Sequence, residues 1–433
     1  FAADNRQVAT LRDAMQEYWN RVRAGDIGSL PAILGLVVLF IVFSFANDKF
    51  LSTLNLANLI TQSGSICVLA MGLVFVLLLG EIDLSAGVAG GVAASITGLM
   101  MTNHGQPWYF GVIIGILAGT VIGLMIGILV SKLGIPSFVV TLAFFLALQG
   151  VILKLIGQGG AISIDDNVIR GMTIKNVPVT LGWILAILLV VVFAAISLNR
   201  HRIQVAKNLA HDPLVLVVIK IIVFAVIILG VTALLNANRS LNPVFPIEGI
   251  PWVLPVVAVL LIFWTFILGR TSYGRHLYAV GGNAEAARRA GINVGLMKIS
   301  AFMIASSMAA VSGIMAASYA GKVSPSSGGG NTLLYAVAAA VIGGTSLFGG
   351  RGRAIDAVIG GVVIATIANA WVCSTRRPTS TSSSPVACCC SPQASTPSRV
   401  AAGRHPASED PGTNTGGRSI MRAPRRVGTR HQP

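Results

Sequence analysis

The sequence has very little charge for its length. Only 11% of its 433 residues are Asp, Glu, Lys or Arg, whereas 54% are hydrophobic and the mean hydropathy is +0.78. A water-soluble domain of this size does not need so much apolar surface. Apolar runs of about 20 residues recur along the chain, and each is long enough to cross a bilayer. The sequence lacks the short alternating segments of a β-barrel. It therefore predicts an all-α, polytopic helical membrane protein.

Catalytic and cofactor motifs are also lacking. No HExxH, GxSxG or GxxxxGK[ST] pattern occurs, and the glycine-rich stretch Gly343–Arg353 lacks the Lys-Ser/Thr pair of a phosphate loop. The six histidines are scattered, and only Cys67 among the five cysteines lies before the C-terminal region. We therefore expect no enzyme activity, no metal site and no bound cofactor. The basic residues are not interleaved with aromatic ones, so a nucleic-acid partner is not expected either.

Hydropathy predicts eleven membrane spans within a body of residues 29–370, after a cytosolic lead-in at 1–28. The spans lie near 30–46, 58–80, 84–102, 108–131, 136–157, 179–198, 213–235, 252–268, 298–320, 332–348 and 354–370. Two of them, 84–102 and 332–348, are rich in Gly and Ala. Small residues permit close helix contact, so these two are expected inside the bundle.

Basic loops set the predicted orientation. The loops Asn199–Asn208, Gly269–Lys298 and Gly349–Arg353 carry an excess of Lys and Arg. With the N-terminus in the cytosol, these loops follow the sixth, eighth and tenth spans. All three then fall on the cytosolic side, as the positive-inside rule expects.

The segment Gly269–Lys298 contains a short, capped, alanine-rich helix. A helix of about seven residues is marginal in water on its own, so something must hold it in place. It either docks on another protein through a small-residue face that includes Ala287, or packs on its own bundle. The residues that define it are the N-cap Asn283, the first-turn acid Glu285, the last-turn bases Arg288 and Arg289, and the C′ residue Gly291.

A second notable stretch, "LLLGEIDLSAG", places Glu81 and Asp83 between two apolar spans. Ionisable groups at membrane depth are costly and usually functional. The two carboxylates could line a translocation pathway, with Ser85 beside them. Alternatively, the stretch is an ordinary cytosolic turn in which Asp83 caps the next helix. Gln149, inside the fifth predicted span, could bind a polar solute or join helices.

Three stretches together resemble a known family: "GEIDLSAG", "YAVGGNAEAARRAGINV" and "VIGGTSLFGGRGR". In this order they resemble the permease subunits of bacterial ABC importers for monosaccharides, over roughly residues 25–370. The span pair around Asn199–Asn208 looks most like the longer, xylose-type members. The resemblance implies a type II ABC-importer permease bundle in the bacterial plasma membrane, which moves a monosaccharide inward by alternating access.

The resemblance also implies partners. The segment Asn283–Gly291 matches the coupling helix of such importers, which docks in a cleft of a separate ATPase subunit that binds the ATP. A second permease copy and an extracytoplasmic sugar-binding protein complete the assembly. The rival interpretation is a secondary transporter that uses Glu81 and Asp83 as proton or sodium sites. Glu81 stands where the family usually has Gly, which leaves its role open.

The C-terminal stretch Trp371–Pro433 departs from the family pattern. It holds nine arginines, no lysine and only two acidic residues, and it has no apolar periodicity. We expect it to be disordered. After eleven spans it would also lie outside, against the positive-inside bias, where the resemblance implies a twelfth span. We therefore expect a frameshift near Ala370.

Overall fold

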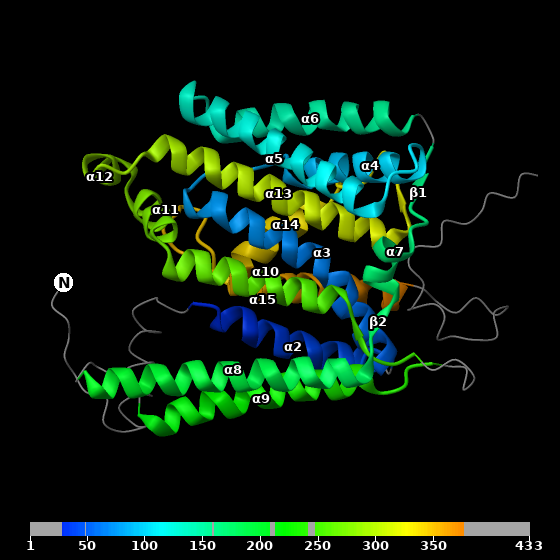
Figure 1. Ribbon diagram of the computed structural model, residues 1–433, viewed down its shortest axis with the longest axis vertical. Coiled ribbons are helices and arrows are strands. Elements are labelled where there is room, and N and C mark those ends of the chain that lie inside the picture. Colours follow the sequence, from blue (N-terminus) through cyan, green and yellow to red (C-terminus); the bar gives the residue numbers. More distant parts are fainter. Residues whose placement is uncertain (1–27, 48, 158–159, 208–212, 241–246, 376–433) are drawn as a thin grey trace, which may run out of the picture. The chain divides into compact units, whose positions relative to one another are not determined.

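The computed structural model describes residues 28–375, apart from residue 48 and the segments 158–159, 208–212 and 241–246 (Figure 1). All of these residues belong to one compact unit, Phe1–Gln393. Residues 371–375, the first five of the predicted disordered tail, continue the helix that begins at Ala354, so the expected disorder is wrong there. The predicted lead-in and the tail beyond Thr375 lie outside the described residues, so the expectations for them stay predictions.

Helices dominate the described chain, and the predicted fold class is confirmed. Each of the eleven predicted spans contains a helix. By length and composition, seven of these helices in the described part can cross a membrane: α3 (Thr53–Leu78), α5 (Trp108–Lys132), α6 (Ser137–Ile156), α8 (Val179–Ala206), α9 (Leu214–Asn236), α10 (Val253–Arg270) and α13 (Val294–Ala320).

Four further apolar helices are shorter or are described over a shorter length. These are α2 (Leu30–Ala46), α4 (Ala86–Thr102), α14 (Thr332–Gly343) and α15 (Ala354–Thr375). The connections hold the small helices α7 (Asn167–Ile174), α11 (Ser272–Gly282) and α12 (Ala284–Arg289). They also hold two antiparallel strand pairs, β1 (Ile162–Ser163) with β4 (Lys322–Val323) and β2 (Asn176–Val177) with β3 (Ile250–Pro251).

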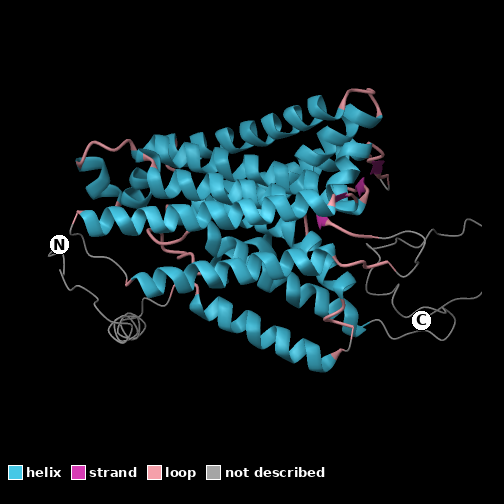
Figure 2. Ribbon diagram, turned by 60° about the horizontal axis from the view of Figure 1, so that its bottom comes forward, coloured by secondary structure: helices cyan, strands magenta, loops and turns pink. Residues whose placement is uncertain are grey.

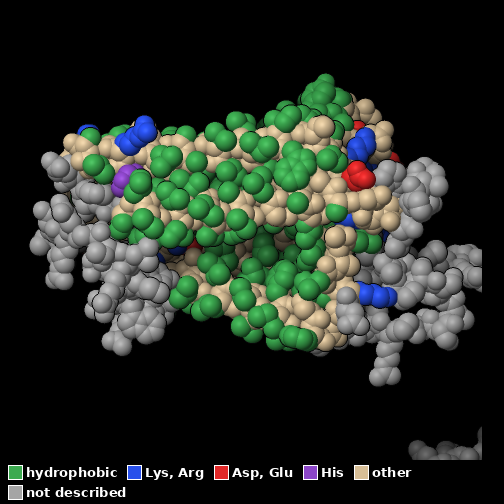
Figure 3. All heavy atoms as spheres, turned by 90° about the horizontal axis from the view of Figure 1, so that it is seen from below, with side chains coloured by type: hydrophobic (Ala, Val, Ile, Leu, Met, Phe, Trp, Pro, Cys, Tyr) green, Lys and Arg blue, Asp and Glu red, His purple; other side chains and the backbone are tan. Residues whose placement is uncertain are grey.

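The long helices run side by side, so the bundle has two ends (Figures 1 and 2). One end carries α11, α12 and the loop 344–353, and we call it the α12 face. The other carries α7 and both strand pairs, and we call it the α7 face. Apolar side chains cover the surface between the two ends, and most of the charged side chains in view lie near the ends (Figure 3). This distribution matches a protein whose middle faces lipid.

The core forms where α3, α4, α5 and α13 approach closely. Gly90 of α4 and Gly313 of α13 face each other, and a methyl group on either would overlap the backbone of the other helix. Most of α4, from Ala86 to Ser95, is buried. The predicted interior position of this Gly/Ala-rich span is therefore confirmed. Small residues let the helix backbones meet. The resulting van der Waals contacts hold the helices together, because lipid supplies no hydrophobic driving force between them.

Two of the helices begin inside the bundle rather than at its end. Gly90, one turn into α4, packs on the Ala309 carbonyl, which lies about 16 Å along α13 from Lys298 at the α12 face. The chain reaches that depth through the non-helical segment 79–85. Helix α14 has 12 residues, about 18 Å, and is preceded by the non-helical segment 324–331. It ends at Gly343 because Gly344 takes a φ of +121°, five residues before the predicted end of that span.

Candidate functional site

The three stretches that carry the resemblance meet at the α12 face, although they lie far apart in the sequence. The Gly350 amide donates to the Leu78 carbonyl over 2.8 Å, and Tyr278 Oη donates to the Gly352 carbonyl over 2.6 Å. A methyl group on Gly281 would lie 2.8 Å from the Gly350 nitrogen. We call Gly80, Gly281, Gly349 and Gly350 the glycine junction, because their backbones pack directly on one another. The junction ties the α3–α4 turn, the end of α11 and the loop 344–353 into one unit.

Helix α12 leaves this junction with the predicted caps. The Asn283 side chain accepts from the Ala286 amide over 2.9 Å, and Gly291 takes a left-handed φ of +84°. Glu285 pairs with Arg288 and Arg289, each over 3.3 Å. All three charged side chains are largely exposed, and that of Arg289 is 80% exposed. The free surface of α12 is therefore charged.

Ala287 does not lie on that free surface. It is 4% exposed and packs with Val280, Val294 and Met297 of the same chain. The expectation that its small face meets another protein is therefore wrong for this residue. The small side chain lets α12 lie flat on its own bundle, and the Ile292 amide donates to the Ala287 carbonyl to close the helix end. A partner on this face would meet Glu285, Arg288 and Arg289 instead.

Glu81 has an ion-pair partner that the sequence did not indicate. Its carboxylate lies 2.5 Å from the ammonium group of Lys298, in the first turns of α13, and the two side chains are 16% and 27% exposed. The pair connects the α3–α4 turn to the segment that carries α12. It also neutralises a charge that would otherwise sit unpaired near the membrane, which gives Glu81 a structural reason to be present.

Asp83 and Ser85 hold the start of α4. Asp83 Oδ1 accepts from the Ser85 amide over 2.8 Å and from the Ser85 hydroxyl over 2.7 Å. The N-cap position of α4 is Ser85, two residues later than predicted. Asp83 is 2% exposed, and its Oδ2 atom has no partner among the described residues. Asp83 therefore forms a turn before the cap and still carries one unpaired oxygen inside the bundle.

The two broken spans meet beside Asp83. A methyl group on Gly87, in the first turn of α4, would lie 2.6 Å from the Gly328 carbonyl and 3.6 Å from the Leu333 amide. The amide nitrogen of Gln149 lies close to Gly329 in the same segment. The structure thus brings Asp83, Ser85 and the Gln149 side chain toward one region, whereas Glu81 turns away to Lys298. Non-helical backbone at membrane depth is tolerated where protein buries it or where it lines a water-filled cavity.

Comparisons with known proteins agree with this architecture. A family described as "Branched-chain amino acid transport system / permease component" matches residues 55–383. The chain belongs to this permease family. It is 35% identical to the xylose transport system permease protein of Haemophilus influenzae, over 78% of this chain and 87% of that protein. The Escherichia coli (strain K12) xylose permease protein is 33% identical over 78% of this chain and 83% of its own length.

A ribose import permease protein of Bacillus subtilis (strain 168) is 29% identical over 80% of this chain and 85% of that protein. No solved structure matches the chain. The predicted resemblance to monosaccharide ABC permeases is confirmed. The chain is therefore a transport subunit of the ABC permease type, and its apolar helices and bacterial relatives indicate a multi-pass protein of the inner membrane.

Proposed function

We propose that this permease moves a xylose-like monosaccharide inward by alternating access, driven by ATP hydrolysis in a separate ATPase subunit. The observation that supports this most is the glycine junction. It fastens α12 and the loop 344–353 to the turn before α4. A displacement of α12 by a partner would therefore be transmitted to α4 and α14 through rigid backbone contacts rather than through flexible side chains. The bound ATP belongs to the partner, and we expect no cofactor in this chain.

The distribution of charge supports a cytosolic α12 face. The basic residues Lys132, Arg270, Arg275, Arg288, Arg289, Arg351 and Arg353 lie at or near that end, against few acids. The connections at the α7 face hold the acids Asp165, Asp166 and Glu248 together with the bases Arg170, Lys175, Arg239 and Lys322, so the excess of basic over acidic residues is smaller there. By the positive-inside rule the α12 face is cytosolic and the α7 face meets the sugar-binding protein. The described chain begins beside Arg353, which would place the N-terminus in the cytosol.

The segment 324–331 supports a second permease copy. Ser326, Gly330 and Asn331 are exposed in the single chain, beside the exposed side chains of Leu334 and Tyr335. Unpaired polar backbone at membrane depth does not face lipid. A second copy packed over this surface would shield it and enclose a polar path between the two chains.

The rival ion-coupled mechanism finds less support. Glu81 is already paired with Lys298, so it is not free to take up and release a proton or sodium ion as the mechanism requires. Asp83 remains the only carboxylate of the predicted pair without a cationic partner among the described residues.

Reconstituted transport separates the two mechanisms. The permease would be placed in proteoliposomes with the ATPase and binding protein of its own system, and uptake of radiolabelled D-xylose and D-ribose measured. We expect uptake that needs ATP and the binding protein and that persists when proton and sodium gradients are collapsed. Uptake driven by an ion gradient without the ATPase would refute the proposal.

A further inference from the structure

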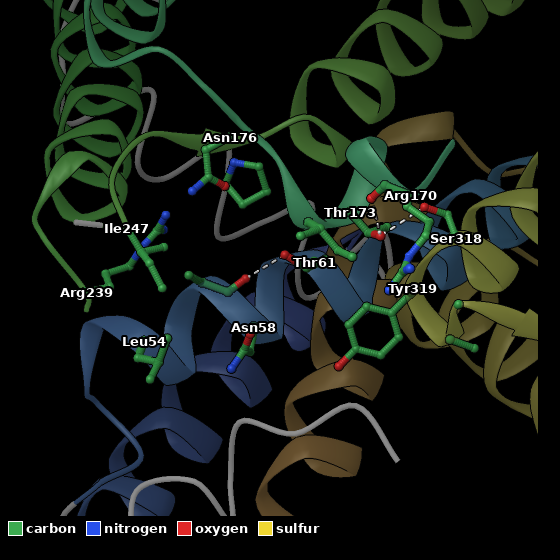
Figure 4. A pocket seen from close by; sticks show the side chains of 15 residues that line it. Leu54, Asn58, Thr61, Arg170, Thr173, Asn176, Arg239, Ile247, Ser318 and Tyr319 are labelled. Atoms are coloured by element: carbon green, nitrogen blue, oxygen red, sulfur yellow. Dashed lines mark hydrogen bonds between the residues drawn. The ribbon is translucent and has the colours of Figure 1, made fainter. Parts of the chain in front are cut away.

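A pocket with several polar groups set in a mostly apolar wall opens at the α7 face, in a region that the sequence did not single out. It has a volume of about 290 Å³ and lies between the first turns of α3, helix α7, the end of α13 and the connection before β3 (Figure 4). This volume is close to the lower end of the range of about 300–1,000 Å³ typical of small-molecule sites. Its polar lining includes Asn58, Thr61, Thr173, Asn176, Arg239 and Tyr319.

Two buried donors in this lining have no acceptor among the described residues. Arg239 is only 5% exposed, and its Nη2 donates to the Gly249 carbonyl over 2.8 Å, whereas Nη1 has no partner among the described residues. The amide nitrogen of Asn58 is also buried and also lacks a partner there. Each such group costs about 1–3 kcal/mol when it stays unpaired. Both atoms are buried behind the pocket wall, so a ligand that brings acceptor oxygens would meet them once either side chain turns into the cavity.

The rest of the pocket fits an uncharged, hydroxyl-rich ligand. Thr61 and Thr173 present hydroxyl oxygens, and Tyr319 adds an aromatic ring on the side opposite Arg239 (Figure 4). The other guanidinium of the lining, Arg170, lies 3.6 Å from Asp165 and is partly neutralised by it. Arg239 is therefore the one unneutralised charge among the described lining residues, and it is positioned to donate to a hydroxyl as well as to an anion.

The pocket continues into the bundle. A second cavity of about 120 Å³ lies deeper and shares Thr61, Thr173 and Tyr319 with the first. Gln62 Nε2 donates to Tyr319 Oη over 3.0 Å where the two cavities adjoin. This hydrogen bond joins α3 to α13, so a relative movement of these two helices would change the passage between the cavities.

We propose that this pocket within a single permease chain is the first site to which a monosaccharide binds when it enters from the α7 face. Hydroxyl oxygens of the sugar accept from Asn58 Nδ2 and Arg239 Nη1, and its hydroxyl hydrogens are donated to Thr61 and Thr173. Tyr319 and Gln62 form the floor that must part for the sugar to advance. The sugar class rests on the function proposed above, whereas the site and its donors rest on the pocket itself.

The test uses Asn58→Leu, which removes an orphan donor and keeps the side-chain size. Asn236→Leu is the matched control, because Asn236 is also an amide with buried unpaired atoms but lines neither cavity. Uptake of D-xylose and D-ribose is measured in the reconstituted transporter with saturating binding protein. Loss of a hydrogen bond of about 1 kcal/mol corresponds to about a fivefold fall in initial rate, expected for Asn58→Leu and not for Asn236→Leu. Arg239→Met, which removes a charged donor, should lower the initial rate of uptake by about 10-fold or more.

Protection of an introduced cysteine from chemical labelling tests sugar binding independently of transport. Asn58→Cys, in a chain whose other cysteines are replaced, is labelled with a charged methanethiosulfonate reagent. D-Xylose should slow the labelling. Equal uptake by wild type and Asn58→Leu, together with labelling that no sugar slows, would overturn the pocket proposal. Stronger protection by a sugar acid such as D-xylonate would also overturn it in favour of an anion site. A wild-type transporter that imports neither sugar would instead overturn the proposed function.

Discussion

The inner helices α3 and α13 are more buried but less hydrophobic than the outer helices α8 and α9. In soluble proteins the buried helices are the more hydrophobic ones. In their most apolar windows, α3 and α13 bury 78% and 56% of the residues, whereas α8 and α9 bury 11% and 6%. Yet the mean hydropathy of those windows is 2.0 and 1.8 for the inner pair, against 2.9 and 3.3 for the outer pair. The most hydrophobic helices are the least packed, because lipid is their solvent. Small and polar residues mark the interior.

The outer pair is attached mainly at one end. Leu235 of α9 packs with Ala57 of α3 and with the strand residues Val177 and Ile250 at the α7 face. Elsewhere α8 and α9 pack on each other, as in the stacked rings of Phe193 and Phe224, whose centroids are 4.2 Å apart. The hairpin therefore behaves as an addition to the bundle rather than as part of its core. The predictions below test this contrast, from the largest expected effect to the smallest.

The largest effect is expected where the inner backbones touch. Gly313→Val places two methyl groups against the Gly90 backbone of α4, and overpacking of rigid backbone costs about 3 kcal/mol or more. We expect little folded protein in detergent, measured by fluorescence-detected size exclusion. Gly230→Val in α9 is the control, because no atom lies within 4 Å of a methyl group at that position. An equal loss in both variants would remove the distinction between inner and outer helices.

A smaller but clear effect is expected at the ion pair that joins the core to α12. Lys298→Met leaves Glu81 without its partner in a partly buried place. After allowance for partial exposure we expect a cost of about 1–2 kcal/mol, seen as a lower melting temperature of the detergent-solubilised protein. The double variant Glu81→Gln/Lys298→Met should recover part of that loss. A double variant as unstable as the sum of the two single variants would show that the pair has no coupling.

Asp83→Asn should be milder. The new side-chain oxygen can still accept from the Ser85 amide, because Asn and Asp serve such turns about equally well. We expect a stability change of no more than about 1 kcal/mol and ATP-driven uptake within about twofold of wild type. A loss of uptake with unchanged stability would instead assign a role in transport to the negative charge, and would revive the ion-coupled mechanism.

The smallest effect is expected in the outer hairpin. Phe193→Leu removes the ring stack with Phe224, and in this outer hairpin we expect a loss of about 0.5 kcal/mol, the low end for aromatic pairs. Because α8 and α9 contribute little to the core, we expect wild-type uptake and a melting temperature lower by only a degree or two. Failure of this variant to assemble would mean that the hairpin has a structural role that its contacts do not reveal.

Hydropathy predicted where the helices are, but less well where they end. The predicted start of the second span at 58 missed the N-cap Ser52, which accepts from the Asn55 amide. Helix α8 continues to Ala206, eight residues past the predicted end, because polar residues can extend a helix beyond the membrane without raising hydropathy. The predicted end of α14 was too late because hydropathy does not register the left-handed turn at Gly344.

The candidate site was predictable as motifs but not as geometry. The cap residues Asn283 and Gly291 follow from local chemistry alone, and both are confirmed. Which side of α12 faces the bundle depends on Val294 and Met297 of α13, so the inward position of Ala287 could not be read from a helix of six residues. The partner of Glu81 lies more than two hundred residues away at Lys298, and no spacing rule links two positions so distant.

The break in two of the spans also has an electrical consequence. Helices α4 and α14 both begin within the bundle, and their first turns lie against each other at Gly87 and Leu333. The residues at their N-cap positions, Ser85 and Asn331, make no side-chain cap hydrogen bond. Each helix start carries about half a positive charge, of which Asp83 offsets a part beside Ser85. Paired half-helix ends of this kind repel protons and cations in other channels. A neutral solute is not repelled by such a field, so the two broken helices would disfavour cationic cargo relative to a neutral sugar.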